Sequence, residues 1–484
     1  MPQKASAWTS NFYSGSQNIV TKLSVARETQ STSVPLMLNN LAGLSDYNGE
    51  TGRTEPSAYI GGRGQACMKA LLNLKSLLLA TVAPLLFTFW TSAKTAVAGE
   101  WPQWRGAQRD GISTETGLLK QWPPDGPPQI WKTNGLGNGY STVSITKGRI
   151  FTMGLKGNRE FVIALDAADG KPVWVQAHGG RFSNDRGDGP RGTPTVDGDR
   201  VYALGGNGDL SCLDAASGKI VWSLNVLEKF GGSNPHWGTS ESPLILGDRL
   251  LLNAGGPNAS VVALNKRDGT VIWKSGSDRA GYSSAIPLEV AGIPQAVFFT
   301  HQRAIAVDVR NGSLLWDYSQ VANRTANVAT PIVKGNKIFL SSDYGTGCAL
   351  LEIKPEGGKL RAQEIYFNQN MKNHHSSSVL IGDTLYGFSS AILTAMRFDN
   401  GEVIWKDRSV GKGSLVFADG HLYCFSEKGV VGLVEATPNG YQEKGRFSIP
   451  QESLPTWSHP VVAGGRLYLR DQDNLYAFDV RAKK

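Results

Sequence analysis

One motif recurs five times in this chain, with the form of a strand, a tight turn and a second strand that ends in tryptophan. The first copy runs from Ala164 to Trp174. In four copies an Asp or Asn stands eight residues before the Trp and a Gly four before it, whereas the fifth has Arg397 at the acidic position. A unit this short cannot bury its own apolar face, so its copies must stack on one another. The copies end at Trp174, Trp222, Trp273, Trp316 and Trp405.

The spacing within the motif predicts a hairpin. Residues 161–165 form a short apolar strand, and residues 172–174 begin another. Between them the Asp side chain can bond its own backbone, and the Gly accepts a positive φ without steric cost. A second strand pair precedes each copy, as in residues 192–204 around the turn at 197–199. Each unit therefore contains about four short antiparallel strands, which is the blade of a β-propeller.

The number of blades follows from the repeat length. Trp131 and the first four motif tryptophans are 43 to 51 residues apart. Unit five ends at a degenerate 366–367 and unit seven near Phe447, while the last unit, 457–480, has only three strands. We predict that residues 129–132 supply its missing outer strand. The expected fold is all-β, with eight four-stranded antiparallel blades and an N-to-C clasp that leaves no open sheet edge. Seven blades is the alternative if unit five or seven is not a true blade.

The motif copies resemble pyrroloquinoline-quinone (PQQ)-like repeats, which occur in quinoprotein alcohol dehydrogenases and in the propeller lipoprotein of outer-membrane assembly. The resemblance covers roughly residues 129–480. Residues 101–106 and 109–111 are also similar to the lead-in of secreted bacterial quinoprotein-like propellers with no assigned reaction. In this family the repeat tryptophans dock between neighbouring blades. The resemblance therefore implies structural roles for Trp131, Trp174, Trp222, Trp273, Trp316 and Trp405.

The first 98 residues have the features of a leader. Residues 1–67 are polar and aperiodic, which indicates a disordered extension or a wrongly assigned start. Residues 68–98 contain Lys69 and Lys75, an apolar run and the small residues Ala96-Val97-Ala98, which predicts a signal peptide cleaved after Ala98. Residues 99–128 then form a lead-in segment and residues 129–484 the propeller. Since no Cys follows the apolar run, we expect a soluble periplasmic or secreted protein without a lipid anchor or a transmembrane span.

Charge and cysteine content narrow the class of partner. Removing the first 98 residues leaves 41 Lys/Arg against 37 Asp/Glu, a net charge of +4 without pattern. This balance does not favour nucleic-acid binding. Cys212, Cys348 and Cys424 are dispersed over different blades, so they form no disulfide framework and are expected to be small buried hydrophobes. We expect a monomer.

Candidate ligand-binding residues gather at one end of the expected central channel, which we call the mouth. The segments just before each inner strand converge there, and the loops between second and third strands reach the same face. Four of the seven histidines fall in these segments, among aromatic and amide side chains. Such a composition is typical of a ligand site, although any one member could instead satisfy backbone groups at a blade edge. The predicted mouth ring is Tyr140, Arg191, His236, Trp237, Tyr282, Asn327, Asp343, Tyr344, Asn373, His374, His375, Lys412, Trp457 and His459.

A metal is not predicted at the mouth ring. Imidazole suits Zn or Cu. However, His374 and His375 are adjacent, and on a strand their side chains would point to opposite faces. Asp343 is the only acidic candidate that the pattern places clearly at the mouth.

Two main functions fit these features. The first is an exported propeller that binds a small molecule, a glycan or an envelope protein at the mouth without catalysis. The alternative, implied by the resemblance, is a PQQ-dependent alcohol or sugar dehydrogenase with Ca²⁺. Such enzymes typically carry an adjacent cysteine pair, a stacking Trp and a Glu/Asn/Asp set. The chain offers Trp237 and Asp343 but no adjacent cysteines and no acidic cluster at the mouth. A third possibility is a hydrolase or lyase using Tyr140, Tyr282 or a mouth histidine as acid or base.

Overall fold

The computed structural model describes residues 99–452 and 454–483. The expected N-terminal extension (1–67) and signal peptide (68–98) lie outside the described residues. Within the described part, no helix is long and apolar enough to cross a membrane. Residues 99–452 contain the short helix α2 (Val226–Phe230), which Asn225 caps by accepting bonds from the amides of Leu227 and Glu228.

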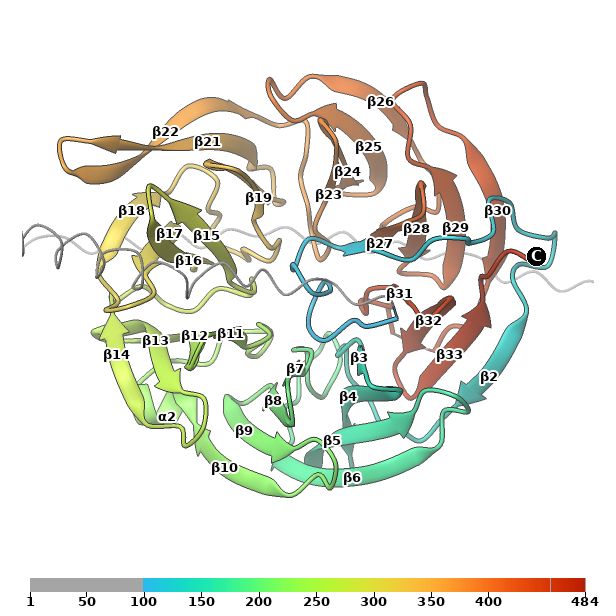
Figure 1. Ribbon diagram of the computed structural model, residues 1–484, viewed down its shortest axis with the longest axis horizontal. Coiled ribbons are helices and arrows are strands. Elements are labelled where there is room, and N and C mark those ends of the chain that lie inside the picture. Colours follow the sequence, from blue (N-terminus) through green and yellow to red (C-terminus); the bar gives the residue numbers. More distant parts are fainter. Residues whose placement is uncertain (1–98, 453, 484) are drawn as a thin grey trace, which may run out of the picture. The chain divides into compact units, whose positions relative to one another are not determined.

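Eight sheets, each with four antiparallel blade strands, are arranged in a ring (Figure 1). Each of blades one to seven takes four consecutive strands, with the innermost strand first in sequence. Blades one and two contain β3 (Ser144–Thr146), β4 (Arg149–Lys156), β5 (Arg159–Asp166), β6 (Pro172–Gly180), β7 (Thr195–Asp197), β8 (Arg200–Leu204), β9 (Asp209–Asp214) and β10 (Ile220–Asn225). Blades three and four contain β11 (Leu244–Leu246), β12 (Arg249–Gly256), β13 (Ala259–Asn265), β14 (Val271–Ser275), β15 (Ile286–Val290), β16 (Ile293–Phe299), β17 (Ala304–Asp308) and β18 (Leu314–Tyr318).

The second half of the ring follows the same order. Blades five and six contain β19 (Ile332–Lys334), β20 (Lys337–Ser342), β21 (Gly347–Glu356), β22 (Lys359–Asn368), β23 (Val379–Ile381), β24 (Thr384–Ser389), β25 (Ile392–Arg397) and β26 (Val403–Asp407). Blade seven contains β27 (Gly413–Ala418), β28 (His421–Ser426), β29 (Val430–Glu435) and β30 (Glu443–Ser448), and blade eight β31 (Val461–Ala463), β32 (Arg466–Asp471) and β33 (Asn474–Asp479). The eight-bladed prediction is confirmed, and units five and seven are true blades.

The ring is closed by the N-terminal strand β2 (Gln129–Thr133). It pairs antiparallel with β33, with Gln129 opposite Phe478 and Thr133 opposite Leu475. Lys132 also lies over the ring of Tyr476, 5.1 Å from its centroid. Blade eight is therefore built from both ends of the propeller sequence, as its missing outer strand predicted. No strand is left unpaired where the ring closes. We call the join of blade eight with β2 and blade one the seam.

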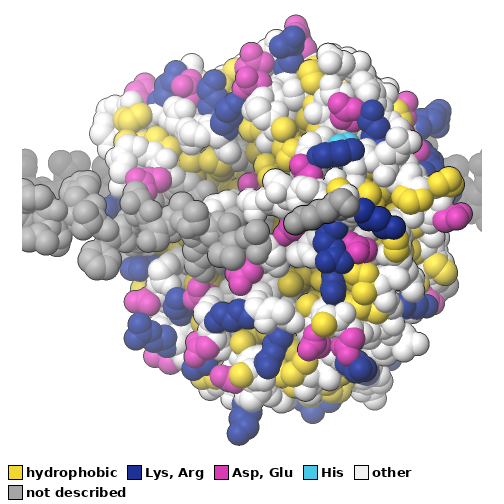
Figure 2. Space-filling view, turned by 45° about the vertical axis from the view of Figure 1, so that its right-hand side comes forward, with side chains coloured by type: hydrophobic (Ala, Val, Ile, Leu, Met, Phe, Trp, Pro, Cys, Tyr) yellow, Lys and Arg dark blue, Asp and Glu magenta, His cyan; other side chains and the backbone are white. Residues whose placement is uncertain are grey.

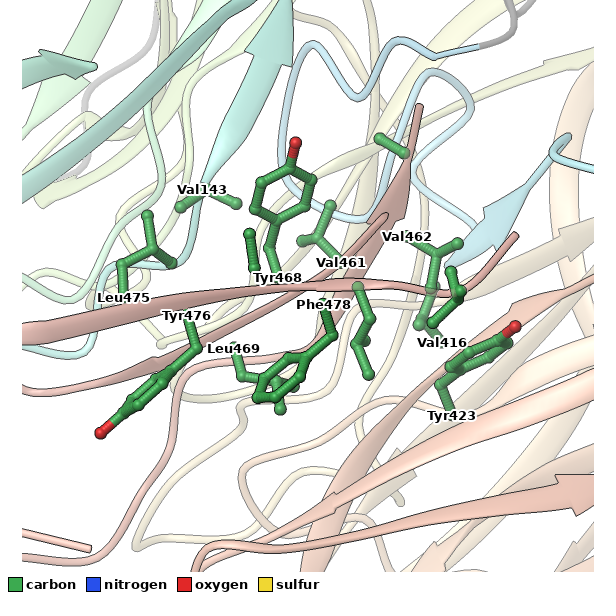
Figure 3. Packing of buried hydrophobic residues seen from close by; sticks show 14 of the residues in the cluster. Val143, Val416, Tyr423, Val461, Val462, Tyr468, Leu469, Leu475, Tyr476 and Phe478 are labelled. Carbon is green, nitrogen blue, oxygen red and sulfur yellow. The ribbon is translucent and has the colours of Figure 1, made fainter. Parts of the chain in front are cut away.

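Buried apolar side chains cover both faces of blade eight. Figure 3 shows Tyr468 and Val461 of blade eight between Val143, just before blade one, and Val416 of blade seven. All four are at most 3 % exposed. Removing this area from water is the dominant favourable term that holds neighbouring blades together.

The repeat motif works between blades rather than within one. The indole Nε1 of Trp174 in blade one donates to the carbonyl of Ala215, which follows the motif Asp214 in blade two, at 3.1 Å. The same bond joins Trp131 to Ala167 (3.3 Å), Trp222 to Lys266 (3.1 Å), Trp273 to Val309 (3.0 Å) and Trp405 to Thr437 (2.9 Å). Trp316 differs, donating to Gln295 Oε1 at 2.8 Å, because β21 and β22 of blade five extend into a long hairpin without the motif turn.

The motif glycine is required by the same contact. Gly218 has a φ of +74°, and a Cβ built there would lie 2.6 Å from the indole of Trp174. Gly198 has a similar φ of +66° but has no atom within 4 Å of such a Cβ. The two glycines therefore share the backbone constraint and differ in the interblade contact.

Gly218→Ala is expected to lower the free energy of unfolding by about 2–4 kcal/mol, since left-handed strain and overpacking add. Gly198→Ala, the matched control, keeps only the strain of about 1–2 kcal/mol. Chemical denaturation of both variants measures the difference. Equal losses would contradict the interblade role of the motif glycine.

The lead-in segment, residues 99–128, crosses the centre of the ring (blue in Figure 1). Trp104 Nε1 donates to Thr330 Oγ1 at 2.9 Å, Arg105 Nη2 to the carbonyl of Ser378 at 2.6 Å, and Arg109 Nη1 to that of Ala285 at 2.9 Å. Strand β1 (Ile112–Ser113) then pairs parallel with β27. The lead-in thereby ties distant blades together and occupies the channel, which the sequence pattern did not indicate.

The visible face in Figure 2 carries Lys and Arg side chains mixed with Asp and Glu, with apolar side chains between them. No field of one sign covers that face. This agrees with the weak net charge, and steering by bulk charge is not a feature of it.

Candidate functional site

Residues of the predicted mouth ring from distant blades meet one another. The rings of Tyr344 and His374 are 5.3 Å apart, those of His374 and His375 5.8 Å, and those of His375 and Trp457 6.1 Å. Trp457 in turn lies 4.9 Å from Tyr140. A continuous run of aromatic contacts therefore links blades five, six, eight and one.

A second run continues around the mouth through Arg191. Its guanidinium lies 5.5 Å from the ring centroid of Tyr140, and its Nε donates to the carbonyl of Trp237 at 2.8 Å. Trp237 is 5.7 Å from Tyr282 and 5.0 Å from His236. The inner-strand starts of blades two, three and four thus join the same surface.

Several members of the ring are committed to internal bonds. Asn327, fully buried, donates from Nδ2 to the carbonyls of Thr300 and His301. Asn373, 2 % exposed, donates to the carbonyl of Phe388 at 3.1 Å and accepts from Ser378. Both side chains satisfy backbone and hydroxyl groups at blade edges, which favours a structural role for them.

Tyr140, Arg191 and His459 are also held by internal partners. The Tyr140 hydroxyl donates to the carbonyl of Arg186, and the Arg191 Nη atoms donate to the carbonyls of Gly187 and Gly189. The His459 ring packs 4.5 Å from Trp104 of the lead-in, and burial lowers the pKa of His459 to about 3. These internal contacts favour structural roles for the three side chains.

Glu427, in the loop between β28 and β29, is a central residue that the sequence pattern missed. Its Oε1 accepts from Trp457 Nε1 at 2.7 Å, and it lies 3.1 Å from Lys412 Nζ and 3.5 Å from His375 Nδ1. The expectation that Asp343 is the one clearly placed acid at the mouth is therefore wrong. The rule that loops between second and third strands reach this face could have located Glu427.

The prediction that His374 and His375 lie on a strand is also wrong. His374 and His375 lie in a bend before β23 rather than on a strand, so their side chains need not point to opposite faces. Ligand atoms of His374, His375 and Glu427 all lie within 4.8 Å of one another. We call these three residues the His–His–Glu cluster.

Burial keeps the imidazoles of this cluster neutral. It lowers the pKa of His374, and Lys412 adds to that effect. It lowers the pKa of His375 well below the ordinary value, with neighbouring His459, His374 and Lys412 acting in the same direction. A neutral imidazole carries a free lone pair and can act as a hydrogen-bond acceptor or a ligand.

The loop that carries Asp343 and Tyr344 is fixed in an uncommon conformation. Tyr344 has a φ of +56°, and its side chain is 44 % exposed. Asp343 Oδ1 accepts from the Tyr344 amide at 2.8 Å, and both carboxylate oxygens accept from Ser390 Oγ at 3.1 Å. A left-handed backbone at a non-glycine residue persists where its surroundings impose it, and here the bonds of Asp343 hold the loop.

A pocket of about 320 Å³ lies away from the mouth ring. The lead-in and blades two to four line it, including Arg109, Leu244 and Gln295. The Arg109 guanidinium is already engaged by the carbonyls of Ser242, Pro243 and Ala285. We place the candidate site at the mouth because the His–His–Glu cluster and the exposed ring of Tyr344 lie together there.

Comparison with known proteins shows the family to which the chain belongs. A family model described as outer membrane protein assembly factor BamB matches residues 128–202 and 158–407, which is more than half of the chain. The chain belongs to this family of PQQ-like repeat β-propellers.

Individual relatives are distant. BamB of Yersinia pestis is 25 % identical over 56 % of this chain and 68 % of its own length. BamB of Shewanella oneidensis is 28 % identical over 35 % of this chain, which spans 44 % of that relative. A polyvinylalcohol dehydrogenase from a Pseudomonas species is 28 % identical over 32 % of this chain and 26 % of its own length.

Two solved structures share the fold. BamB from Moraxella catarrhalis superposes with a TM-score of 0.54 at 15 % identity, over 74 % of this chain and 98 % of that one. Quinohemoprotein alcohol dehydrogenase from Comamonas testosteroni gives a TM-score of 0.52 at 12 % identity, over 81 % and 82 %. At such identities the likeness concerns the fold alone.

The residues present do not fit the quinone arrangement that the resemblance implies. The free cysteines of the described part, Cys212, Cys348 and Cys424, are buried in blades two, five and seven. Burial raises the pKa of Cys348 to about 12. Arg191, the mouth guanidinium, gives three of its five N–H groups to backbone carbonyls, which favours a structural role for it.

Proposed function

We propose that this protein is an exported envelope β-propeller that binds a partner protein at the mouth and performs no covalent chemistry. Membership of the family described as an outer-membrane assembly factor supports an envelope location and a protein partner. The exported state also rests on the predicted signal peptide at residues 68–98. A small molecule or a glycan is the alternative occupant of the mouth.

The observation that carries the proposal is the presentation of Tyr344. Its ring is exposed, yet its backbone is held by Asp343 and its hydroxyl lies 3.2 Å from His374 Nε2. Exposing a large aromatic side chain in a fixed conformation lowers the entropic cost of binding. Tyrosines with these features dominate the energy of many protein interfaces.

A photo-crosslinking amino acid at position 344 tests the proposal in intact cells. We expect a defined adduct with an envelope protein, identified by mass spectrometry. Position 365, an exposed isoleucine on the outer strand β22, is the matched control and should give none. The identified partner, once purified, should bind Tyr344→Ala about tenfold or more weakly. Equal adducts at both positions, or unchanged binding by Tyr344→Ala, would contradict the proposal.

A PQQ-dependent dehydrogenase is the second candidate, favoured by the fold shared with quinohemoprotein alcohol dehydrogenases. It is tested by adding PQQ and Ca²⁺ to the purified protein and following dye-linked oxidation of alcohols or sugars. Saturable quinone binding that Trp237→Ala abolishes would favour this candidate over partner binding. Because the chain has no adjacent cysteine pair, we expect neither PQQ binding nor oxidation of alcohols or sugars.

A further inference from the structure

Three metal-ligating side chains converge at the mouth from separate parts of the chain. The ligand atoms of the His–His–Glu cluster lie within 4.8 Å of one another, and His375 Nδ1 is 3.5 Å from Glu427 Oε1. The edge of a tetrahedron with zinc bonds of about 2.0–2.1 Å is about 3.4 Å. The His375–Glu427 pair therefore already has the spacing of two ligands of one ion.

Three ring nitrogens of the cluster have no hydrogen-bond partner among the described residues. The His375 side chain is 10 % exposed, and neither ring nitrogen has a hydrogen-bond partner among the described residues. His374 Nδ1 is likewise buried without a partner in that part of the chain. Buried polar atoms are nearly always satisfied, so these orphaned nitrogens, one of them 3.5 Å from Glu427 Oε1, call for a missing group.

Tyr344 prepares one of the ligands. Its hydroxyl lies 3.2 Å from His374 Nε2 and can accept the ring proton there. That tautomer leaves the lone pair on Nδ1, the orphaned nitrogen. Histidines that bind metals commonly have their second nitrogen held in this way.

We propose that His374, His375 and Glu427 form a binding site for a divalent first-row transition metal ion, with Zn²⁺ as the probe. Two imidazoles and one carboxylate suit this class of ion, and three protein ligands leave a coordination position for water or a ligand. The site is independent of the proposed partner, since it rests on groups that face one another within the mouth.

The charge of Lys412 should lower the affinity of the cluster for a metal ion. Its ammonium lies 3.1 Å from Glu427 Oε1 and neutralises the carboxylate while no ion is bound. An incoming cation must displace or tolerate this charge. Lys412→Met should therefore strengthen metal binding by about tenfold or more, which a merely structural Glu427 would not produce.

The test is calorimetric titration of the full chain, stripped with EDTA, with ZnCl₂ at neutral pH. We expect one saturable site per chain, and Co²⁺ at the same site should show the visible absorption of tetrahedral cobalt. His375→Ala and Glu427→Gln should weaken binding by more than about 100-fold, and Tyr344→Phe by about 10–100-fold. His301→Ala, at a histidine outside the mouth ring, should bind zinc as the wild type does.

Circular dichroism establishes that each variant is folded. Glu427→Gln keeps an oxygen acceptor for Trp457, so it carries the test if His375→Ala does not fold. The absence of saturable zinc binding would overturn the proposal. Zinc binding that is unchanged in His375→Ala and Glu427→Gln would overturn it equally.

Discussion

Arg470→Met is expected to lower the free energy of unfolding by about 4 kcal/mol. Arg470 is 1 % exposed on β32 of blade eight, and its guanidinium reaches across the seam into blade one. Nη1 donates to the carbonyl of Ser141 at 2.8 Å and to Thr152 Oγ1 at 2.6 Å, and Nη2 to the carbonyl of Gly137 at 3.1 Å. Each acceptor orphaned by the substitution costs about 1–3 kcal/mol.

The control for this prediction is Arg481→Met. The Arg481 side chain is 62 % exposed and pairs with Asp479 at 2.7 Å, and such a surface pair contributes at most about 1 kcal/mol. Denaturant unfolding measures both variants, and hydrogen exchange should show faster opening of blades one and eight in Arg470→Met. A loss below about 1 kcal/mol in Arg470→Met would show that the seam does not depend on this residue.

Glu241→Gln is expected to remove a large part of the pH dependence of stability. Burial raises the pKa of Glu241 to about 8, although the amide of Asn253 and the charge of Arg109 oppose the shift. The unfolded chain releases this proton near 4.5. Between these pH values the folded state binds more protons, so stability falls as pH rises, by about 1.4 kcal/mol per pH unit.

The wild type should therefore lose about 3–4 kcal/mol relative to Glu241→Gln between pH 5 and pH 8. Denaturant unfolding at several pH values measures this difference. Glu160, whose pKa burial raises to about 7, titrates in both proteins and cancels from the comparison. Parallel pH profiles would show that Glu241 is ionised in the folded protein.

The fold was predictable because the repeat encodes an interblade contact of fixed length. A Trp of one blade requires a Gly in the turn of the next, as Trp174 and Gly218 show. The last three-stranded unit then required a partner, and residues 129–132 were the predicted strand, which the structure shows as β2. The lead-in was less predictable, since Arg109 is held by backbone carbonyls, which leave no pattern in the sequence.

The sequence predicted which residues lie together at the mouth, but not which of them bond internally and which remain free to bind a ligand. Topology places the inner-strand starts together, and Tyr344, His374, His375 and Trp457 do meet. Whether a polar side chain bonds its own blade or remains free depends on side-chain geometry, so Asn327 could not be separated from His375. The position of Glu427 between second and third strands could have been used to place it at the mouth, but its bonds to Trp457 and Lys412 leave no pattern in the sequence.

The closure that gathers the mouth residues is tested most directly by a disulfide across the clasp. Lys132 and Tyr476 are opposite one another, with side chains on the same side of the pair. Lys132→Cys with Tyr476→Cys should form a cross-link in the oxidised folded protein, seen by mass spectrometry as one peptide joining the two segments. Lys132→Cys with Leu314→Cys, on the outer strand of blade four, should not. Free thiols at 132 and 476, or equal cross-linking in both variants, would contradict a ring closed between β2 and β33.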